Sequence, residues 1–550
     1  MSSQTSAPST GEQPRALFSS RTAFLFAAIG SAVGLGNIWR FPYVAYESGG
    51  GAFLIPYLTA LLTAGIPLLF LDYAMGHRFR GSAPKAFRRL KSWAEPMGWI
   101  QVGVAFFIGV YYAVIVAWAA LYAFKSFTQA WGDDPNTYFF EDFLRMDATS
   151  TATLDFVWPI AITMAVVWAL IIAVLVIGVD KGIGLVNKIF IPLLAVLFFI
   201  VVVFSLTLDG AVDGLNAFFT PEWSALRDPE VWINAYGQIF FSLSIAFGIM
   251  LTYSSYLRPR TNLTGTGLVT AFANSSFEVL AGVGVFATLG FMANQQGVAV
   301  GEVATSGIGL AFIAFPTVIS QMGGIFGGIF GFLFFVSLFI AGVTSLMSII
   351  EVVNSAVQDK LGISRTTAVL TVGGTMAVIS LLLFPTTSGL PTLDIMDKWT
   401  NSLGIVGAAI IAIILIDWIL HRSDELAMHL NAVSSFKVGT TWRIFTANIT
   451  PVVLLVMLGS EVINLFKEPY GGYSTMQINL YGWGVLGLVL VASLLLSLFP
   501  WRGEQFLTGP PGSDFGVPVD AQIVAREPRV AETGAPLTSP IETPTAKEVR

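Results

Sequence analysis

The chain has 550 residues, of which 55% are hydrophobic and only 11% are charged, and its formal net charge is −6. This composition excludes an ordinary soluble protein and is typical of a multi-pass membrane protein. The acidic balance offers no basic surface for nucleic acid, while the absence of cysteine and the presence of only three histidines exclude disulfides and ordinary thiolate or histidine metal cages.

The two ends of the chain have a different composition from the rest. Residues 1–20 are rich in Ser, Thr, Pro and Gly and lack the apolar segment of a signal peptide, which predicts a cytoplasmic N-terminal tail. Residues 501–550 are polar and Pro-rich with hardly any aromatic residue, which predicts a disordered, cytoplasmic C-terminal tail.

Between these tails, apolar runs long enough to cross a hydrocarbon core of about 30 Å recur twelve times. They cover residues 22–46, 51–76, 98–127, 156–178, 183–208, 232–257, 266–292, 325–358, 366–385, 397–421, 443–465 and 480–499. The sequence therefore predicts an all-α integral membrane protein with about twelve transmembrane helices.

The first and sixth runs are interrupted near mid-span, by residues 30–37, which include Gly34, Gly36 and Asn37, and by residues 242–248. Polar interruptions at matching positions of two five-helix halves are typical of inverted repeats, whose discontinuous helices build a substrate site near the midplane. Close packing through small residues is the alternative for the glycines, but the Asn37 amide needs partners at that depth. The predicted domains are a first repeat at 21–210, an inverted repeat at 230–422 and two extra helices at 440–500.

Positive residues are concentrated in the loop after the second run, which contains Arg78, Arg80, Lys85, Arg88, Arg89 and Lys91. The loop after the third run instead contains Asp133, Asp134, Glu141, Asp142 and Asp147, with Arg145. Because short cytoplasmic loops retain Lys and Arg, both termini are predicted to be cytoplasmic. The lack of cysteine and the short outer loops favour a bacterial plasma (inner) membrane.

Two motifs in and after the first run are distinctive: GLGNIWRFP at residues 34–42 and GGGAF at residues 49–53. At these motifs the chain resembles the neurotransmitter:sodium symporter family. The resemblance continues through Tyr111-Tyr112, residues 237–244 and residues 341–345, and covers about residues 15–420 in order. It implies a bacterial amino-acid transporter of that family, coupled to sodium and working by alternating access.

The resemblance implies that a substrate carboxylate binds to the backbone N–H groups of Leu35 and Gly36 and to the Tyr112 hydroxyl. A helix end suits an anion because its N–H groups lack partners. Relatives that carry monoamines have an aspartate at the position of Gly34, so an amino acid is expected. The mostly apolar lining favours a neutral side chain. The full expected set is Ala32, Leu35, Gly36, Ile108, Tyr112, Phe241, Ser244, Phe247, Ser345 and Ile349.

Two sodium sites are implied by the same resemblance. The first lies beside the substrate carboxylate and has the ligands Ala32, Asn37, Ser242 and Asn274. The second has the ligands Gly30, Val33, Ala341, Thr344 and Ser345. Neutral, hard oxygen ligands of this kind suit a hard cation. For Thr344 and Ser345 the alternative is the ordinary bond of a membrane-helix hydroxyl to its own i−4 carbonyl.

Two acidic residues lie within apolar runs. Glu278 is one helical turn from Asn274, so both share one face. An ionisable residue in a membrane helix costs about 2.5 kcal/mol or more, which suggests a function. Chloride-dependent relatives have an uncharged residue here, so the resemblance implies that Glu278 replaces chloride; the alternative is a structural acid bonded to Gln238 or Ser242. Asp72 matches an acidic position of the family and has no assigned role.

The resemblance also implies two gates made of charged pairs. Arg40 and Asp397 match the outer gate, whereas Arg15 and Asp359, supported by Tyr256, match the cytoplasmic gate. Arginine and a carboxylate can close a pathway through a bidentate ion pair that opens on hydration. For Arg15 the alternative is a purely topological role before the first span.

The predicted function is therefore a sodium-coupled symporter for neutral, apolar amino acids, with the substrate, sodium ions and the bilayer as its partners. A non-transporting receptor or ligand-gated channel on the same scaffold is the alternative, because a fold does not settle function. A receptor, however, needs no coupling ions. An enzyme is not expected, because the sequence shows no nucleophile–base pair or metal cluster.

Overall fold

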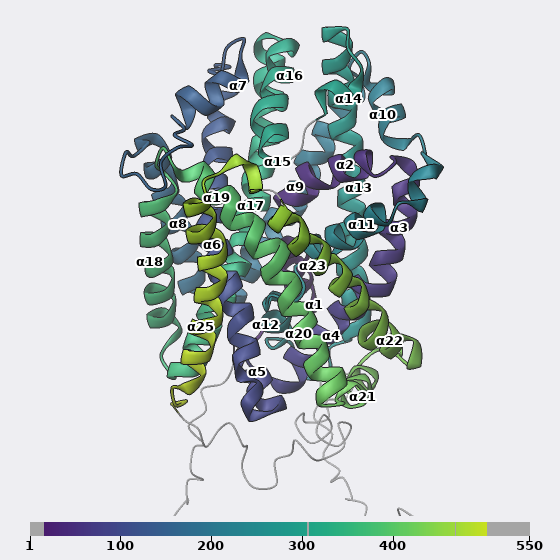
Figure 1. Cartoon of the computed structure of the whole chain (residues 1–550), viewed down its shortest axis with the longest axis vertical. Coiled ribbons are helices and arrows are strands. Elements are labelled where there is room, and N and C mark those ends of the chain that lie inside the picture. Colours follow the sequence, from purple (N-terminus) through teal and green to yellow (C-terminus); the bar gives the residue numbers. More distant parts are fainter. Residues whose placement is uncertain (1–15, 305–306, 468, 503–550) are drawn as a thin grey trace, which may run out of the picture.

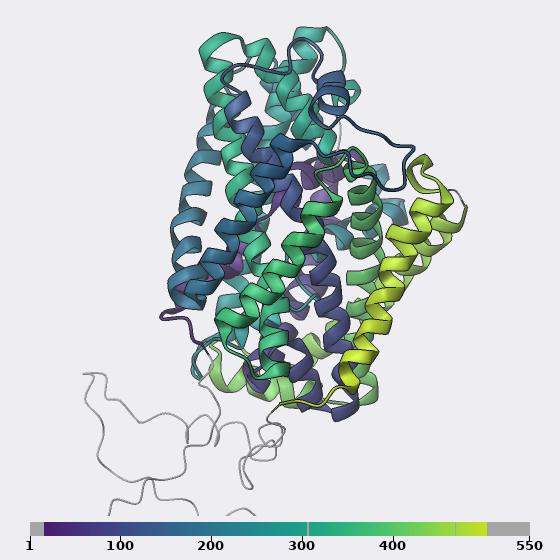
Figure 2. The same ribbon diagram turned by 90° about the vertical axis from the view of Figure 1, so that its left-hand side faces the viewer.

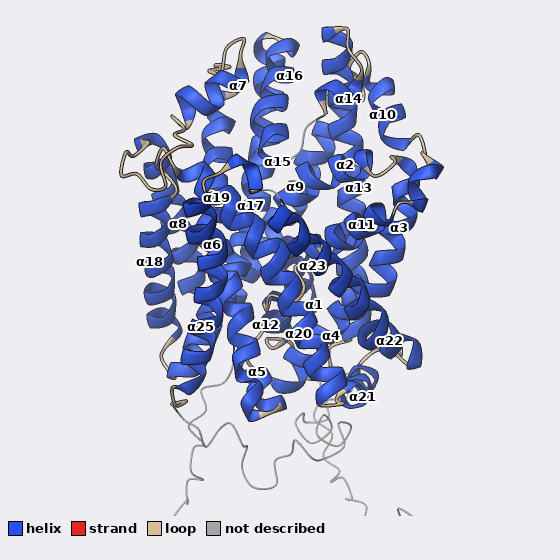
Figure 3. Ribbon diagram, viewed as in Figure 1, coloured by secondary structure: helices blue, strands red, loops and turns tan. Residues whose placement is uncertain are grey.

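The computed structural model describes residues 16–304, 307–467 and 469–502, and within these residues every element is a helix (Figure 3). The helices form one elongated bundle (Figures 1 and 2). Ten helices in the described ranges are long and apolar enough to cross a membrane, and the bent pair α1–α2 makes an eleventh. The chain is a multi-pass, all-α membrane protein.

The first five predicted spans correspond to helices. α1 (Arg21–Ala32) and α2 (Leu35–Glu47) form the first span and meet at a bend of 52°. The next four are η1 to α4 (Gly51–Phe53, Leu54–Ala60, Leu61–Gly65 and Ile66–Phe79), η3 with α6 (Ser92–Ala94 and Glu95–Lys125), α8 (Trp158–Ile177), and η5 with α9 (Val179–Gly184 and Leu185–Ser205). The η elements are 3-10 or π turns, and most of them continue an α-helix.

The sixth predicted span is divided into α11 (Pro229–Ser242) and α12 (Ile249–Ser254), separated by the non-helical residues 243–248. The later spans are α13 (Leu263–Gln296), α17 (Gly324–Leu361), α18 (Arg365–Leu383), α19 to η9 (Gly389–Trp399, Thr400–Ile405, Val406–Ile413 and Ile414–Ile419), α22 to η11 (Thr440–Ile444, Phe445–Ile449, Thr450–Lys467 and Tyr470–Gly472) and α24 to α25 (Thr475–Gln477, Ile478–Trp483 and Gly484–Leu498).

Short helices that the sequence analysis did not predict cover the two ends of the bundle. These helices include α7 (Pro135–Thr137), η4 (Tyr138–Phe143), α10 (Ala211–Phe219), η6 (Trp223–Arg227), α14 (Val300–Val303), α15 (Gly307–Gly309), η7 (Leu310–Ala314) and α16 (Phe315–Met322). Of these, α7, α10, α14 and α16 lie towards the upper end in Figure 1. At the lower end lie α5 (Ala83–Leu90) and α21 (Ser423–Val433). The first and last described segments of the chain also lie towards the lower end (Figure 2).

Burial separates central helices from those on the outside of the bundle. In the most apolar window of α17, 83% of the residues are buried, compared with 33% in the span Val179–Ser205. α17 packs along α6 in the middle of the bundle. Because lipid is as apolar as these side chains, the outer helices can remain exposed.

The two helix breaks face each other and have different backbones. At the first break, Val33 and Gly34 are extended, with φ of −75° and −119°. At the second, Ser244 and Ala246 adopt left-handed conformations, with φ of 53° and 68°. The Ser244 hydroxyl donates to the carbonyl of Ser31 at 2.8 Å, so the second break is bonded directly to the end of α1.

Candidate functional site

A cavity lies where the two breaks meet α6 and α17. Its lining contains all ten residues that the sequence analysis assigned to substrate binding: Ala32, Leu35, Gly36, Ile108, Tyr112, Phe241, Ser244, Phe247, Ser345 and Ile349. Further lining residues are Ser31, Gly34, Asn37, Tyr111, Ser242, Ile249, Asp397, Asn401 and Ile405. Segments far apart in the sequence therefore converge on one mostly apolar space.

The start of α2 supplies the donors at one side of this cavity. The N–H of Leu35 points to the Tyr112 hydroxyl at 3.4 Å, and the N–H of Gly34 donates to Asn37 Oδ1 at 2.8 Å. The Phe241 ring packs so tightly on Gly36 that a Cβ there would lie 2.2 Å from the ring. A helix N-terminus next to a phenolic hydroxyl is a suitable place for a carboxylate.

The four predicted ligands of the first sodium lie together. Asn37 Nδ2 donates to Asn274 Oδ1 at 2.8 Å, and Asn274 Nδ2 donates to Ser242 Oγ at 3.0 Å. All three side chains are buried, and Ala32 lines the adjoining cavity wall. The donor set is neutral and rich in oxygen, which fits Na⁺; the described residues contain no cluster of three His, Cys, Asp or Glu side chains that would suit a divalent metal.

The predicted second sodium site lies at the contact between α1 and α17. Ser345 Oγ is 3.3 Å from the Gly30 carbonyl and 3.4 Å from that of Ser31. Thr344 Oγ1 donates to the carbonyls of Ile340 and Ala341, each at 3.0 Å. These are bonds within its own helix, as in the alternative reading of Thr344 as an ordinary membrane-helix hydroxyl. Val33 follows at the end of α1, where its N–H donates to Ile29.

Glu278 is completely buried and has neutral partners in the described chain. Its carboxylate accepts hydrogen bonds from Gln238 Nε2 at 2.6 Å and from the Tyr57 hydroxyl. Gln238 was the expected structural partner, whereas sequence reasoning missed Tyr57, which lies in α3 without a distinctive motif. The charge therefore lies close to the Asn274 face without a direct ion pair.

The structure does not bring Arg40 and Asp397 into an ion pair. Asp397 instead accepts hydrogen bonds from the Tyr111 hydroxyl and from Asn401 Nδ2, both at 2.7 Å. The Arg40 guanidinium lies over the Phe241 ring, 4.7 Å from its centroid, as in a cation–π contact. Tyr111 and Asn401 are thus cavity residues that the sequence analysis did not assign.

At the lower end, the Arg15 prediction lies outside the described residues. The Asp359 carboxylate accepts a hydrogen bond from the Ser82 N–H at 2.8 Å. The Tyr256 hydroxyl donates to Glu351 at 2.7 Å, and Glu351 also forms two hydrogen bonds of 2.8 Å with Arg365. The sequence analysis did not single out this pair, although an acid inside the apolar α17 was a visible signal.

Asp72 contacts the second helix break. Its Oδ2 accepts the N–H of Ala246 at 3.2 Å, and its own carbonyl lies 3.4 Å from the Ser254 hydroxyl of α12. A carboxylate of α4 therefore supports the left-handed segment between α11 and α12.

Two discontinuous helices that face each other across a cavity inside a multi-pass bundle define a membrane transporter of the broken-helix class. The family model described as the sodium:neurotransmitter symporter family matches residues 15–138 and 132–501. The chain belongs to this family, which confirms the resemblance seen in the sequence.

Relatives agree with this assignment over most of the chain. An uncharacterized sodium-dependent transporter of Methanocaldococcus jannaschii is 39% identical over 482 residues, which cover 88% of this chain and 97% of the relative. The sodium-dependent serotonin transporter of Drosophila melanogaster is 31% identical over 84% of this chain and 79% of its own length. The crystal structure of MhsT in complex with L-phenylalanine matches with a TM-score of 0.67 and 31% identity, over 82% of this chain and all of that one.

Proposed function

We propose that the chain imports neutral, apolar amino acids together with sodium, and that it does so without a chloride requirement. The observation that carries this proposal is the cavity itself, in which carboxylate donors at the start of α2 adjoin an apolar pocket and a neutral cluster of oxygen ligands. The solved relative in complex with L-phenylalanine supports a substrate of this class.

The chemistry of the lining selects the substrate. The Leu35 and Gly36 N–H groups and the Tyr112 hydroxyl hold the carboxylate, while Ile108, Phe241, Phe247 and Ile349 surround the side chain. A charged side chain would lose its hydration here without gaining a counter-ion. Gly34 offers no carboxylate to an amine, which separates this substrate class from monoamines.

Coupling follows from direct contact between the ion and the substrate. One sodium ion is held by Ala32, Asn37, Ser242 and Asn274 beside the substrate carboxylate. A second is held by Gly30, Val33, Ala341, Thr344 and Ser345 at the α1–α17 contact. Both ions stabilise the contacts of α1 with α17 and α13. When the ions dissociate to the inner side, these helices can separate.

Glu278 supplies the fixed negative charge near the first ion. Its carboxylate lies one turn from Asn274 and has neutral partners in the described chain, so its charge is available to balance a cation. Transport is therefore independent of chloride.

The proposal also covers the inverted repeats, the membrane orientation and the two gates. We place the two inverted repeats at 21–210 and 230–422 in a plasma membrane, with both termini in the cytoplasm. In the states in which each pathway is closed, Arg40 pairs with Asp397 on the outer side, an ion pair that the present conformation lacks, and Asp359 pairs with Arg15 beside Tyr256 on the inner side.

Uptake into proteoliposomes tests the proposal. Concentrative uptake of leucine or phenylalanine should disappear when external sodium is replaced by potassium or choline, and it should persist when chloride is replaced by gluconate. Neutral apolar amino acids should compete, whereas aspartate, lysine and dopamine should not. Sodium-independent substrate binding without uptake would instead favour a receptor, and equal loss in gluconate would contradict the role of Glu278.

A further inference from the structure

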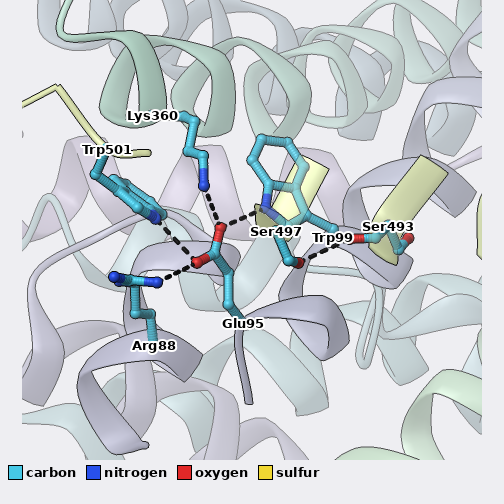
Figure 4. A network of polar contacts seen from close by, with 7 residues as sticks. All are labelled: Arg88, Glu95, Trp99, Lys360, Ser493, Ser497 and Trp501. Atoms are coloured by element: carbon cyan, nitrogen blue, oxygen red, sulfur yellow. Dashed lines mark hydrogen bonds and ion pairs between the residues drawn. The ribbon is translucent and has the colours of Figure 1, made fainter. Parts of the chain in front are cut away.

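A second cluster of buried charges lies at the lower end of the bundle, away from the cavity. Glu95, the first residue of α6, has only 1% of its surface exposed. Its Oε1 accepts Lys360 Nζ at 2.6 Å and Trp99 Nε1 at 2.9 Å, and its Oε2 accepts Arg88 Nη1 at 2.8 Å (Figure 4). The start of α6 is thus joined to α5 and to the last turn of α17.

Trp501, which follows α25, completes this cluster. Trp501 Nε1 donates to Glu95 Oε2 at 2.9 Å, and the Trp501 ring lies over Lys360, with Nζ 4.7 Å from its centroid. Figure 4 shows the indole and Lys360 converging on the same carboxylate. Only 6% of Trp501 is exposed, although the composition of residues 501–550 predicted a tail without structure. One indole therefore both donates to the acid and covers the ammonium group.

The next residue closes the end of a helix. The Arg502 N–H donates to the carbonyl of Lys360 at 3.2 Å, in the last turn of α17, where helix carbonyls lack partners of their own. Gly362 follows with φ of 62° and ends the helix. Residues 501–502 therefore act as an external cap on α17.

This cap adjoins the residue that we assign to the inner gate. Asp359 directly precedes Lys360, and its carboxylate holds the N–H of Ser82, the residue before α5. Residues 501–502 thus hold together the junction of α5, α6 and α17, where Asp359 lies.

We infer that residues 501–502 form a clasp that holds the inner pathway closed. Packing of Trp501 on Lys360 and Glu95 keeps the end of α17 against α6, and release of the indole frees the gate end of α17. This inference rests on the alternating access of the proposed function and adds a control outside the permeation pathway.

The natural absence of cysteine allows a direct test. Ser348 is buried on α17, where it accepts the Tyr253 hydroxyl of α12 at 2.7 Å and directly precedes the cavity residue Ile349. In a Ser348→Cys background that retains sodium-dependent binding, a charged thiol reagent is applied from the cytoplasmic side. Trp501→Ala should increase the labelling rate about fivefold, the change in an equilibrium expected when one net hydrogen bond is lost.

Two matched variants separate the clasp from the rest of the tail. Trp501→Phe keeps a ring over Lys360 but lacks the N–H, so its labelling rate should be intermediate; deletion of residues 503–550 leaves the clasp intact and should not change the rate. Monodisperse elution and an unchanged Tm show that each variant is folded. If Trp501→Ala does not fold, the labelling rate of Trp501→Phe tests the inference instead. Parental rates in both Trp501 variants, or an increase on tail deletion equal to that of Trp501→Ala, would overturn the inference. Because labelling requires no substrate, such a result leaves the substrate assignment intact.

Discussion

The two helix breaks that form the cavity reach a similar role through different backbones. The break between α1 and α2 consists of two extended residues, and Gly34 leaves room for the neighbouring Tyr112 and Ser345. The break between α11 and α12 is longer and has Ser244 and Ala246 in left-handed conformations that are costly for residues with a Cβ. The first break is permitted by a small residue, whereas the second has to be supported by its neighbours.

That support comes from outside the broken helix. Asp72 of α4 accepts the N–H of Ala246, and Ser31 of α1 accepts the hydroxyl of Ser244. The second break is therefore coupled both to α4 and to the first break. We expect mutations around it to change stability, and mutations around the first break to change binding.

The largest effect is expected from Asp72→Ala. Removing the acceptor leaves the buried Ala246 N–H without a partner, which costs about 1–3 kcal/mol of unfolding free energy. Thermal unfolding in detergent measures this loss, and uptake should fall with it. Asp72→Asn keeps a side-chain oxygen and is the matched control; equal stability of the alanine variant and wild type would contradict the supporting role.

Asn37→Ala tests the ion at the first break. Because coupling between two ligands is reciprocal, this variant should weaken substrate and sodium binding together, by about tenfold each. Thr344→Ala should mainly increase the sodium concentration required, since the proposed second ion touches no substrate. Equilibrium substrate binding measured over a sodium titration compares the two variants. Identical binding curves would contradict the proposal of two separate sodium sites.

Gly34→Ala tests whether the first break serves binding rather than stability. The added Cβ would lie 3.0 Å from Ser345 Oγ and 3.4 Å from the Tyr112 hydroxyl, so substrate affinity should fall by about 1 kcal/mol while Tm stays near that of wild type. Gly237→Ala is the control, because its Cβ would meet only Met457 at 3.3 Å, outside the cavity lining. A large fall in Tm for Gly34→Ala with unchanged substrate affinity would show that the first break serves stability rather than binding.

The smallest effect is expected from Ala246→Gly. Glycine adopts a positive φ at no steric cost, but it also gains freedom in the unfolded chain. The net gain in stability should therefore be only about 0.5 kcal/mol, visible as a small increase in Tm. A decrease would show that the left-handed backbone at Ala246 carries no strain.

Much of the fold follows from the sequence, because the length of an apolar run and the polarity of its interruptions are local properties. The cavity residues came from the family motifs, and the structure places all ten around one space. The short helices at the ends, such as α5 and α21, were missed because they are brief and partly charged. They carry no hydropathy signal.

The partners of charged groups were harder to predict from the sequence. Asp397 lies near Arg40, but it is satisfied by Tyr111 and Asn401, since a carboxylate takes the donors that a given conformation brings within about 3 Å. Trp501 illustrates the same limit. The residues that follow it are polar, and its burial depends on Glu95 and Lys360, which lie more than a hundred residues earlier in the chain.

The length of α17 has a mechanical consequence. At 1.5 Å per residue, its 38 residues form a rod of about 57 Å, with Ser345 near the middle and Lys360 about 22 Å further down. A rotation of about 5° around Ser345 moves the lower end by about 2 Å, more than the Lys360–Glu95 hydrogen bond tolerates. α17 can therefore act as a lever, with the proposed ion ligand Ser345 near its middle and the contacts of Glu95 and Trp501 at its lower end. A rotation that changes the cavity only slightly is enough to break these contacts.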